Sequence, residues 1–290
     1  MVIDAHQHIW DPAQASYPWL TPDLHLIDRA FALDEALPLH REVGVKGCVL
    51  VEASDDPDDA RLMERAADAH PEVLGIVTYS PVSDPVQLAH DLDPTTRHNR
   101  VVGVRNLIHH HPDPDWMLTE AFDEGLGILE ALGLPFDVVA TSSRHLRNLT
   151  TVSERHPGLR LVVDHLGKPP VGGDLGEWRK AIRTVAANPL TAAKLSGLYN
   201  ESRPAAWTPD DLQPIVDHAL EVFGPERLMY GGDWPISVRA GGYRRVWNGI
   251  SQCLLHLRDD EREAVLFQTA ADVYGLAPRA PRNAVGMDIG

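Results

Sequence analysis

Hydrophobic residues gather along the chain in short runs that alternate with longer amphipathic stretches. Eight of the runs are nearly continuous in Val, Ile, Leu and Ala, a pattern typical of parallel strands that are buried on both faces. The predicted strands cover residues 2–6, 45–53, 73–82, 101–108, 135–141, 159–166, 190–198 and 227–235.

The stretches between these runs place apolar residues three or four positions apart, which indicates helices that bury one face. They cover residues 34–44, 59–71, 117–133, 142–158, 175–189 and 208–226, and several end at Gly or Pro, as helices often do. Strands and helices in this alternation predict an α/β fold, a single-domain (β/α)8 TIM barrel over residues 1–277, followed by an irregular tail at 278–290. A doubly wound open sheet is the structural alternative, but no glycine-rich dinucleotide-binding motif follows any strand.

Several predicted strands end in polar residues. Burial of a polar side chain at the end of an apolar strand costs free energy unless the group is hydrogen-bonded. His6 and His8 share one face of the first strand, and four later strands end at Glu52, Arg105, His165 and Asp233. A single histidine at a strand end is more often a hydrogen-bonded structural residue. Because active sites of such barrels lie at the carboxyl ends of the strands, five strands with this ending favour a functional site.

The residue types in this set suit two kinds of chemistry. Imidazoles at positions i and i+2 lie about 6–7 Å apart at the backbone, so His6 and His8 can share one ion or one anionic oxygen. Together with His165 and Asp233 they form a donor set of three nitrogens and one oxygen, which suits a single zinc ion. The same groups can also act without metal, the imidazoles polarising a carbonyl while Asp233 accepts a proton from water.

Composition narrows the classes of partner. The net charge of −16 over 290 residues disfavours nucleic acid and anionic membranes as partners. No apolar run has the length of a membrane span. Cys48 and Cys253 are the two cysteines, so a disulfide framework is not indicated and a reducing, cytoplasmic location fits. A homo-oligomer is compatible with all of these observations.

Aromatic residues gather after strands one, four and eight, where the mouth of the barrel is predicted. They are Trp10, Tyr17, Trp19, Trp116 and Trp234. Aromatic faces stack against sugar or lactone rings, but for any one residue in a long loop local packing is the commoner role. The long segment 10–32 is expected to act as a lid over the mouth.

Other polar residues near the predicted mouth are weaker candidates. Residues 109–111 are three consecutive histidines, which point in different directions and cannot all reach one ion, so we expect a loop beside the mouth. Contact of one of these side chains with substrate is the less favoured alternative. Tyr199 and Arg203 follow strand seven and are candidates for substrate binding, since the arginine fork suits a carboxylate or vicinal hydroxyls. No serine stands in a Gly-x-Ser-x-Gly motif, so a serine nucleophile is not supported.

Six segments in sequence order carry a family resemblance: DAHQHIWDP, VLVEAS, GVRNLIHHHPDPDWM, LVVDHLGKP, KLSGLYNES and MYGGDWPIS. They resemble the lactonase branch of the amidohydrolase superfamily, the amidohydrolase-related family 2. The His-x-His pair alone is a weak signal, but with DHLGKP and GGDWP in order it is specific. Members of this branch act on L-fuconolactone, L-rhamnonolactone, a sulfomuconolactone and 2-pyrone-4,6-dicarboxylate.

The resemblance implies that a small lactone, such as L-fuconolactone or L-rhamnonolactone, is opened by attack of water on the ring carbonyl. Asp233 would be the general base and then the acid that protonates the leaving alkoxide, with His165 beside it. One divalent metal, zinc, would bind to His6, His8, His165 and Asp233, although relatives include metal-independent enzymes. The residues implied or expected to contact substrate are Arg105, Glu52, Trp116, Tyr199, Arg203 and Trp234.

The chain also departs from the better-known binuclear members of the superfamily. Strand four offers Arg105 in place of a bridging lysine or glutamate, and strand five has no histidine at its end, which disfavours a two-metal site. A zinc-dependent decarboxylase on the same barrel, a hydrolase of dicarboxylate or muconolactone type, and a binding protein without turnover are the alternatives. The DPDWM and DHLGKP segments favour the lactonase.

Overall fold

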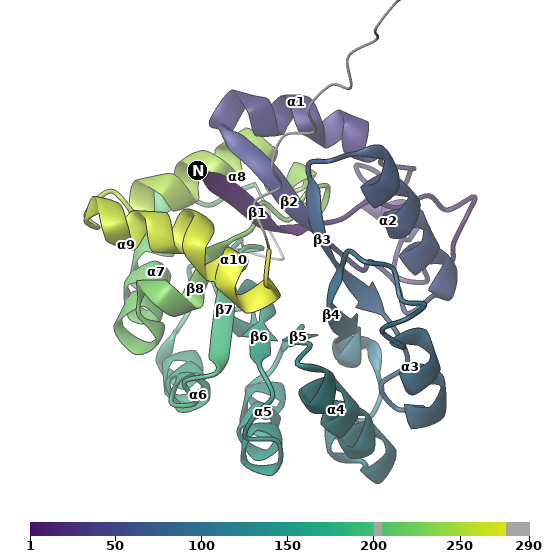
Figure 1. Ribbon diagram of the computed structural model, residues 1–290. Helices are drawn as coiled ribbons and strands as arrows, with labels where there is room; N and C mark the ends of the chain where they lie inside the picture. Colours follow the sequence, from purple (N-terminus) through teal and green to yellow (C-terminus); the bar gives the residue numbers. More distant parts are fainter. Residues whose placement is uncertain (200–204, 277–290) are drawn as a thin grey trace, which may run out of the picture.

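A computed structural model describes residues 1–199 and 205–276 of the chain, and the predicted tail at 278–290 lies outside this part. Eight parallel strands form one sheet in sequence order (Figure 1). They are β1 Val2–Gln7, β2 Val45–Val51, β3 Val73–Tyr79, β4 Val101–Asn106, β5 Phe136–Val138, β6 Leu161–Val163, β7 Thr191–Leu195 and β8 Leu228–Tyr230. The predicted (β/α)8 barrel is therefore confirmed.

The seam between the first and last strands closes the barrel just beyond the end of β8. The Asp233 amide donates to the His6 carbonyl at 2.8 Å, and the His8 amide donates to the Trp234 carbonyl at 2.7 Å. These bonds place the His-x-His pair directly beside the segment that carries Asp233. Residues more than two hundred positions apart in the sequence are thus joined by the closure of the sheet.

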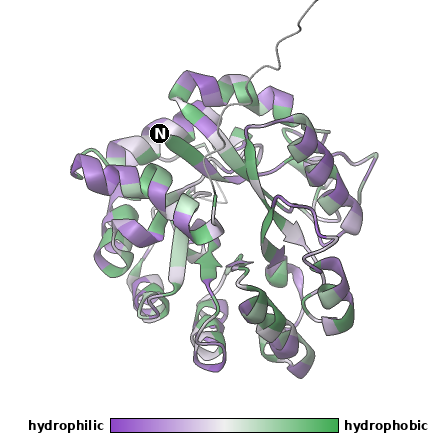
Figure 2. Cartoon of the chain, in the orientation of Figure 1, coloured by the Kyte–Doolittle hydropathy of each residue, from purple (hydrophilic) through white to green (hydrophobic). Residues whose placement is uncertain are grey.

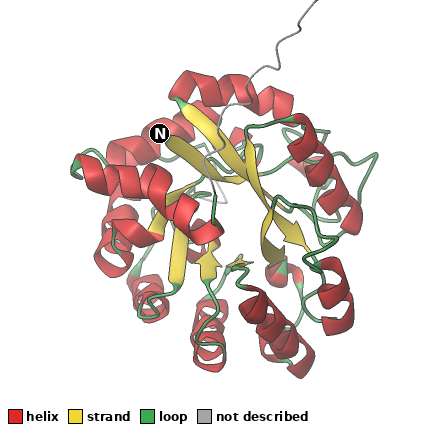
Figure 3. Ribbon diagram, in the orientation of Figure 1, coloured by secondary structure: helices red, strands yellow, loops and turns green. Residues whose placement is uncertain are grey.

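Helices surround the strands on the outside of the barrel (Figure 3). They are α1 Leu33–Val43, α2 Pro57–Ala69, α3 Pro85–Asp91, α4 Glu120–Leu132, α5 Ser143–Arg155, α6 Gly176–Ala186, α7 Pro209–Phe223, α8 Tyr243–Cys253, α9 Asp259–Glu263 and α10 Thr269–Tyr274. The six predicted helices are confirmed, with ends shifted by one to three residues. Within the described ranges, no helix is both long and apolar enough to cross a bilayer.

Apolar side chains fill two layers of core. One layer lies between strands and helices, and the polar faces of the helices point outward (Figure 2). The other lies inside the barrel, where Ile3, Val49 and Val162 pack with Tyr274 of α10. Helix α10 covers the end of the barrel at which the strands begin, since Arg160, directly before β6, donates to the Val273 carbonyl at 3.1 Å. The opposite end is left for a site.

Seven of the predicted strands run two to five residues past the observed ends, and for strands six and eight this changes where the site residues stand. We expected strands that reach His165 and Asp233, whereas β6 ends at Val163 and β8 ends at Tyr230. His165 has a φ of 54° and Asp233 a φ of 51°, in the left-handed region, which cannot continue a β-ladder. Both side chains therefore project from sharp turns just beyond the sheet rather than from the strands themselves.

Candidate active site

A cavity of about 270 Å³ opens at the carboxyl ends of the strands, where the fold predicts an active site. Predicted site residues that line it are His8, Arg105, His165, Tyr199 and Asp233. Lining residues that we expected near the mouth are Trp10, Trp19, His109 and His110, and the remainder are Leu24, Ala53, Leu107, Val139, Lys168, Ile236 and Arg239. Sequence reasoning missed Arg239 because it lies in an irregular segment after β8 that no periodic pattern places at the mouth.

A compact group of donor atoms lies at the base of this cavity, where His8, His165 and Asp233 line the wall and the fully buried His6 lies beside them without lining it. The Nε2 atoms of His6 and His8 are 3.1 Å apart, and Asp233 Oδ1 lies 3.7 Å from the first and 3.4 Å from the second. One donor atom from each of His6, His165 and Asp233 lies within 4.8 Å of the others. The structure therefore brings together all four residues predicted as ligands.

Neighbours on the Nδ1 side orient two of the imidazoles. His8 donates from Nδ1 to the Val51 carbonyl at 2.7 Å, since a carbonyl can only accept. His165 Nδ1 lies 2.8 Å from the Ser196 hydroxyl. Such partners fix the ring and, for His8, leave Nε2 as the nitrogen that faces the cluster.

Glycines let the turns approach the cluster closely. A Cβ on Gly197, whose φ is 57°, would lie 2.5 Å from His165 Nδ1 and 3.1 Å from Asp233 Oδ2. A Cβ on Gly231 would lie 2.5 Å from the Cβ of His6. A side chain at either position would push the imidazoles out of place.

The donor set fits one tetrahedral metal ion. Ligand atoms at zinc–ligand bond lengths stand about 3.4 Å apart in a tetrahedron, close to the 3.1, 3.4 and 3.7 Å that separate His6, His8 and Asp233. Asp233 Oδ2 is buried without a hydrogen-bond partner among the described residues. A buried carboxylate oxygen without a partner is costly, and an ion or a substrate-side proton would satisfy it.

Charges around the cluster set its protonation. Burial raises the pKa of Asp233, but the neighbouring His165 and His8 outweigh that effect and hold it below its usual value. Burial lowers the pKa of His6 and of His165 well below the ordinary value for histidine. The cluster therefore offers an ionised carboxylate at Asp233 and neutral imidazoles at His6 and His165, which is the state that binds a metal and accepts a proton.

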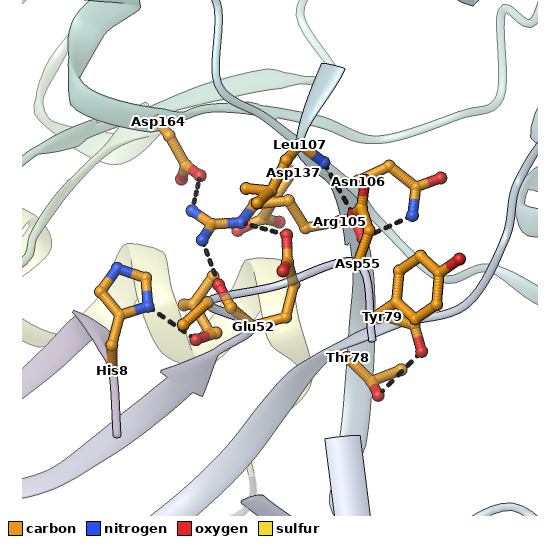
Figure 4. Close-up of polar contacts among 12 residues, drawn as sticks. His8, Glu52, Asp55, Thr78, Tyr79, Arg105, Asn106, Leu107, Asp137 and Asp164 are labelled. Atoms are coloured by element: carbon orange, nitrogen blue, oxygen red, sulfur yellow. Dashed lines mark hydrogen bonds and ion pairs between the residues drawn. The ribbon is translucent and has the colours of Figure 1, made fainter. Parts of the chain in front are cut away.

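Arg105 is paired on two sides deep in the barrel (Figure 4). Its Nε donates to Glu52 Oε1 at 3.0 Å, its NH1 donates to Asp164 Oδ2 at 2.8 Å, and its NH2 donates to the Glu52 carbonyl. NH1 also lies 3.4 Å from His6 Nε2. Glu52 is fully buried and does not line the cavity. The structure thus places Glu52 behind Arg105 rather than on the wall of the cavity.

Burial and these ion pairs act in opposite directions on the charged groups. Burial raises the pKa of Glu52 well above its usual value, although Arg105 opposes the shift. Burial acts to raise the pKa of Asp164 as well, but Lys194 and His6 outweigh it and hold that pKa well below the usual value. The pKa of Arg105 is raised because Glu52 and Asp164 outweigh the effect of its burial.

Lys194 of β7 is a functional candidate that sequence reasoning missed. Its side chain is fully buried, 2.5 Å from Asp137 Oδ2 and 3.0 Å from Asp164 Oδ1, and 3.1 Å from His6 Nδ1. The signal in the sequence was a charged residue inside the apolar run TAAKL, where a fully buried lysine is rare unless it is paired.

The predicted aromatic and cationic contacts divide into two groups. Tyr199 lines the cavity, with Lys168 Nζ 5.3 Å from the centre of its ring. Trp116 stacks on His111 with centroids 4.4 Å apart, and Trp234 packs edge-on against Phe31 at 5.3 Å. Neither tryptophan lines the cavity. Arg203 lies outside the described residues.

The segment 10–32 covers one side of the mouth. Trp10 and Phe31 exchange backbone hydrogen bonds, so the segment starts and ends at one point. Trp19 donates from its indole to the Ala53 carbonyl at 2.7 Å. Tyr17 donates to Asp59 Oδ1 at 2.7 Å, and Asp59 Oδ2 accepts from the Ala53 amide at 2.9 Å. The segment is therefore fastened to the loop after β2 and to α2.

The Asp59 anchor predicts a pH dependence of stability. Burial raises the pKa of Asp59 from 3.8 to about 6, so the folded state holds its proton more tightly than the unfolded chain. The resulting stabilisation is complete below about pH 4 and is lost as the pH rises through 6. In Asp59→Asn this dependence is absent, and we expect the stability advantage of the wild type to shrink by about 3 kcal/mol between pH 4 and 7.

Urea unfolding of both proteins at several pH values measures this difference. Asp58→Asn on the exposed face of the same helix is the matched control and should follow the wild type. Parallel pH curves for the wild type and Asp59→Asn would contradict the raised pKa.

Comparison with known proteins identifies close relatives over most of the chain. The family model Amidohydro_2, described as Amidohydrolase, matches residues 3–276. An L-fucono-1,5-lactonase of Burkholderia ambifaria is 33% identical over 87% of this chain and 86% of its own. An L-fucono-1,5-lactonase of Burkholderia multivorans is 32% identical over 94% of this chain and 96% of its own.

Solved structures share the fold. A Burkholderia multivorans amidohydrolase, described with bound zinc, superposes with a TM-score of 0.89 at 29% identity and covers 96% of this chain and 100% of its own. A 5-carboxyvanillate decarboxylase of Sphingomonas paucimobilis superposes with a TM-score of 0.66, covering 95% of this chain and 98% of its own, but at 15% identity. The second likeness shows the fold alone.

Proposed function

Because the chain belongs to the amidohydrolase family, we propose that it hydrolyses a small lactone derived from a sugar, such as L-fuconolactone or L-rhamnonolactone. The observation that carries the proposal is the convergence of His6, His8, His165 and Asp233 at the base of a mouth cavity. Two curated L-fucono-1,5-lactonases at 32–33% identity support the substrate class. An L-rhamnono-gamma-lactonase of Scheffersomyces stipitis is more distant, at 21% identity over 61% of this chain and 59% of its own.

In this proposal, Asp233 carries the proton transfers. Its Oδ2 atom, buried and without a partner in the described part of the chain, accepts a proton as water attacks the ring carbonyl. An imidazole stabilises the negative charge that develops on the carbonyl oxygen where it presents an N–H group, and His165, which lines the cavity with its Nδ1 beside the Ser196 hydroxyl, can carry that proton on Nε2. The carboxylic acid at Asp233 then returns the proton to the ring oxygen as the ester bond breaks, and the product is an open hydroxy acid.

We further propose that His6, His8, His165 and Asp233 hold one divalent metal ion, and that this ion is zinc. When bound, the ion supplies a Lewis acid that polarises the carbonyl. The donor separations fit such an ion, and a relative at 29% identity is described with bound zinc. The remaining cavity residues would position the sugar: Tyr199 offers a ring face and a hydroxyl, and Arg239 a guanidinium.

A substrate panel tests the function. Purified protein is mixed with aldonolactones, dicarboxylate lactones and aromatic acids, and the pH of a weakly buffered solution is followed. Ring opening of aldonolactones should release acid, whereas decarboxylation of an aromatic acid would consume it. Turnover of dicarboxylate lactones alone would shift the proposal to that substrate class, and carbon dioxide release would favour the decarboxylase.

Removal of metal is expected to lower lactone hydrolysis at least tenfold. The ion would polarise the carbonyl, and neutral imidazoles alone are weaker electrophiles. Activity is measured after dialysis against a chelator and again after one equivalent of zinc, with metal content determined in each sample. Full activity in metal-free protein would show that the imidazole cluster acts without an ion.

A further inference from the structure

His6 has a hydrogen-bond donor and an acceptor beside the same ring nitrogen. Lys194 Nζ lies 3.1 Å from its Nδ1 atom, and Asp164 Oδ1 lies 3.2 Å from it. The lysine and the carboxylate also lie 3.0 Å from one another. A neutral imidazole carries its proton on one nitrogen at a time, so this pair can satisfy either tautomer. A protonated Nδ1 would donate to Asp164, and an unprotonated Nδ1 would accept from Lys194.

The other side of the ring indicates which tautomer exists without metal. His8 uses its Nδ1 proton for the Val51 carbonyl, so in its neutral form its Nε2 can only accept. His6 Nε2 lies 3.1 Å from that atom. Arg105 NH1 also faces His6 Nε2, but it lies farther away, at 3.4 Å, and donates to Asp164 at 2.8 Å. Two unprotonated nitrogens at 3.1 Å would repel, whereas a proton on His6 Nε2 makes this closer contact a hydrogen bond. His6 Nδ1 is then unprotonated and accepts from Lys194.

Metal ligation requires the opposite tautomer. His6 can bind an ion through Nε2 only when that nitrogen is unprotonated, which moves the proton to Nδ1. We propose that Lys194 and Asp164 select the tautomer of His6: Lys194 holds the metal-free form and Asp164 the metal-ligating form. The change exchanges one N–H bond at Nε2 for one at Nδ1, with no change in charge. The metal half of this inference rests on the proposed function, and the metal-free half does not.

Lys194 is held in place for this role from the far end of the barrel. Asp137 Oδ2 lies 2.5 Å from Lys194 Nζ and accepts from the Tyr274 hydroxyl at 2.7 Å. Tyr274 ends α10, the helix that covers the start of the strands. Lys194 is fully buried, so its ammonium cannot turn to solvent. It is a positioning residue that acts on the reaction through His6.

The test combines NMR of histidine with zinc binding. Nitrogen-15 spectra report which ring nitrogen carries the proton, and loss of signals in His6→Gln assigns them. Four proteins are compared: the wild type, Asp137→Asn, Tyr274→Phe and a double variant that combines Lys194→Met and Asp137→Asn. The double variant removes one charge of each sign, which limits the folding defect. The first three retain Lys194, and Tyr274→Phe controls for loosening of the network.

We expect metal-free wild type, Asp137→Asn and Tyr274→Phe to carry the His6 proton on Nε2, and zinc to move it to Nδ1. In the folded double variant, Nδ1 of His6 has lost its donor while Asp164 remains as an acceptor, so we expect the metal-free proton to shift to Nδ1 although the contact with His8 is unchanged. Zinc should then bind about tenfold more tightly than to Asp137→Asn, an effect of the size seen for groups behind metal ligands. A proton on Nδ1 in the metal-free wild type would overturn the inference. So would a folded double variant with an unchanged tautomer and zinc affinity.

The same spectra separate this inference from the proposed function. If no lactone is hydrolysed but the tautomer follows Lys194 as described, the inference holds and the function fails. If lactones are hydrolysed while the double variant keeps the proton on Nε2, the function holds and the role of Lys194 fails.

Discussion

Replacing Asp233 by asparagine is expected to lower kcat for lactone hydrolysis about 10³-fold while the fold is retained. An amide cannot accept the proton of the attacking water, and general base catalysis contributes about 10²–10⁴-fold. The asparagine amide is close in shape to the carboxyl group. The backbone hydrogen bonds at this position also remain, since the residue 233 amide donates to the His6 carbonyl and its carbonyl accepts from the Ser237 amide. Initial rates and the midpoint of thermal unfolding measure the two effects separately.

Asp28→Asn provides a matched control for this experiment. It makes the same chemical change on an exposed residue of the segment after β1, and it should leave both rate and stability unchanged. Zinc content must be determined for Asp233→Asn, because the same carboxylate is a proposed ligand. Turnover within tenfold of the wild type would remove Asp233 from the proton transfers.

Arg105→Met is expected to be the most destabilising single change among the site residues, by about 3–5 kcal/mol. Arg105 is 3% exposed, and its loss leaves Glu52 without its ion-pair partner in the barrel interior. Removal of one partner of a buried ion pair is much more costly than replacement of both. The Asp164 carboxylate is destabilised less than Glu52 by the loss of Arg105, because the Lys194 ammonium remains 3.0 Å away. Equilibrium unfolding in urea measures the difference.

The pH dependence of this loss identifies its source. Burial already raises the pKa of Glu52, and without Arg105 nothing in the pair opposes that shift. A carboxyl whose pKa is raised in the folded state stabilises the fold at low pH, and this contribution is lost as the pH rises through the raised pKa. The defect of Arg105→Met should therefore grow from pH 5 to pH 8. In the double variant Arg105→Met with Glu52→Gln, most of this increase of the defect with pH should be absent. A loss of stability that does not depend on pH would instead indicate that lost packing is its source.

The sequence predicted the barrel because its strands are buried on both faces and read as apolar runs. It placed the ends of most strands too far along the chain, with the largest consequence at β6 and β8, where the apolar pattern continues through residues that leave the sheet. The signal for those turns was local: Gly167 follows His165 closely, and Gly231 and Gly232 directly precede Asp233. Helix α3 was missed because its seven residues span about two turns, too few to establish a helical period.

The candidate site was predictable where residue type and strand position agreed, as for His6, His8, His165 and Asp233. The buried ion pairs behind these residues, among Asp137, Asp164 and Lys194, could not be predicted. Asp164 and Asp137 each stand beside apolar residues and gave no indication of a partner, because their partner Lys194 comes from another strand. Glu52 was predicted to touch substrate, and only its partner Arg105 reveals its place behind the cavity. Pairing between distant strands is a property of the closed fold.

The seam between β1 and the segment after β8 has a consequence for assembly. His6 lies in the first strand and His8 directly follows it, and Asp233 is held beside them by the backbone hydrogen bonds that close the barrel between β1 and the segment after β8. No contiguous half of the polypeptide contains the whole ligand set. If the chain is divided between β4 and β5, each fragment should bind zinc poorly, and mixing the two fragments should restore the affinity. Zinc binding would then show when the two fragments have joined along this seam.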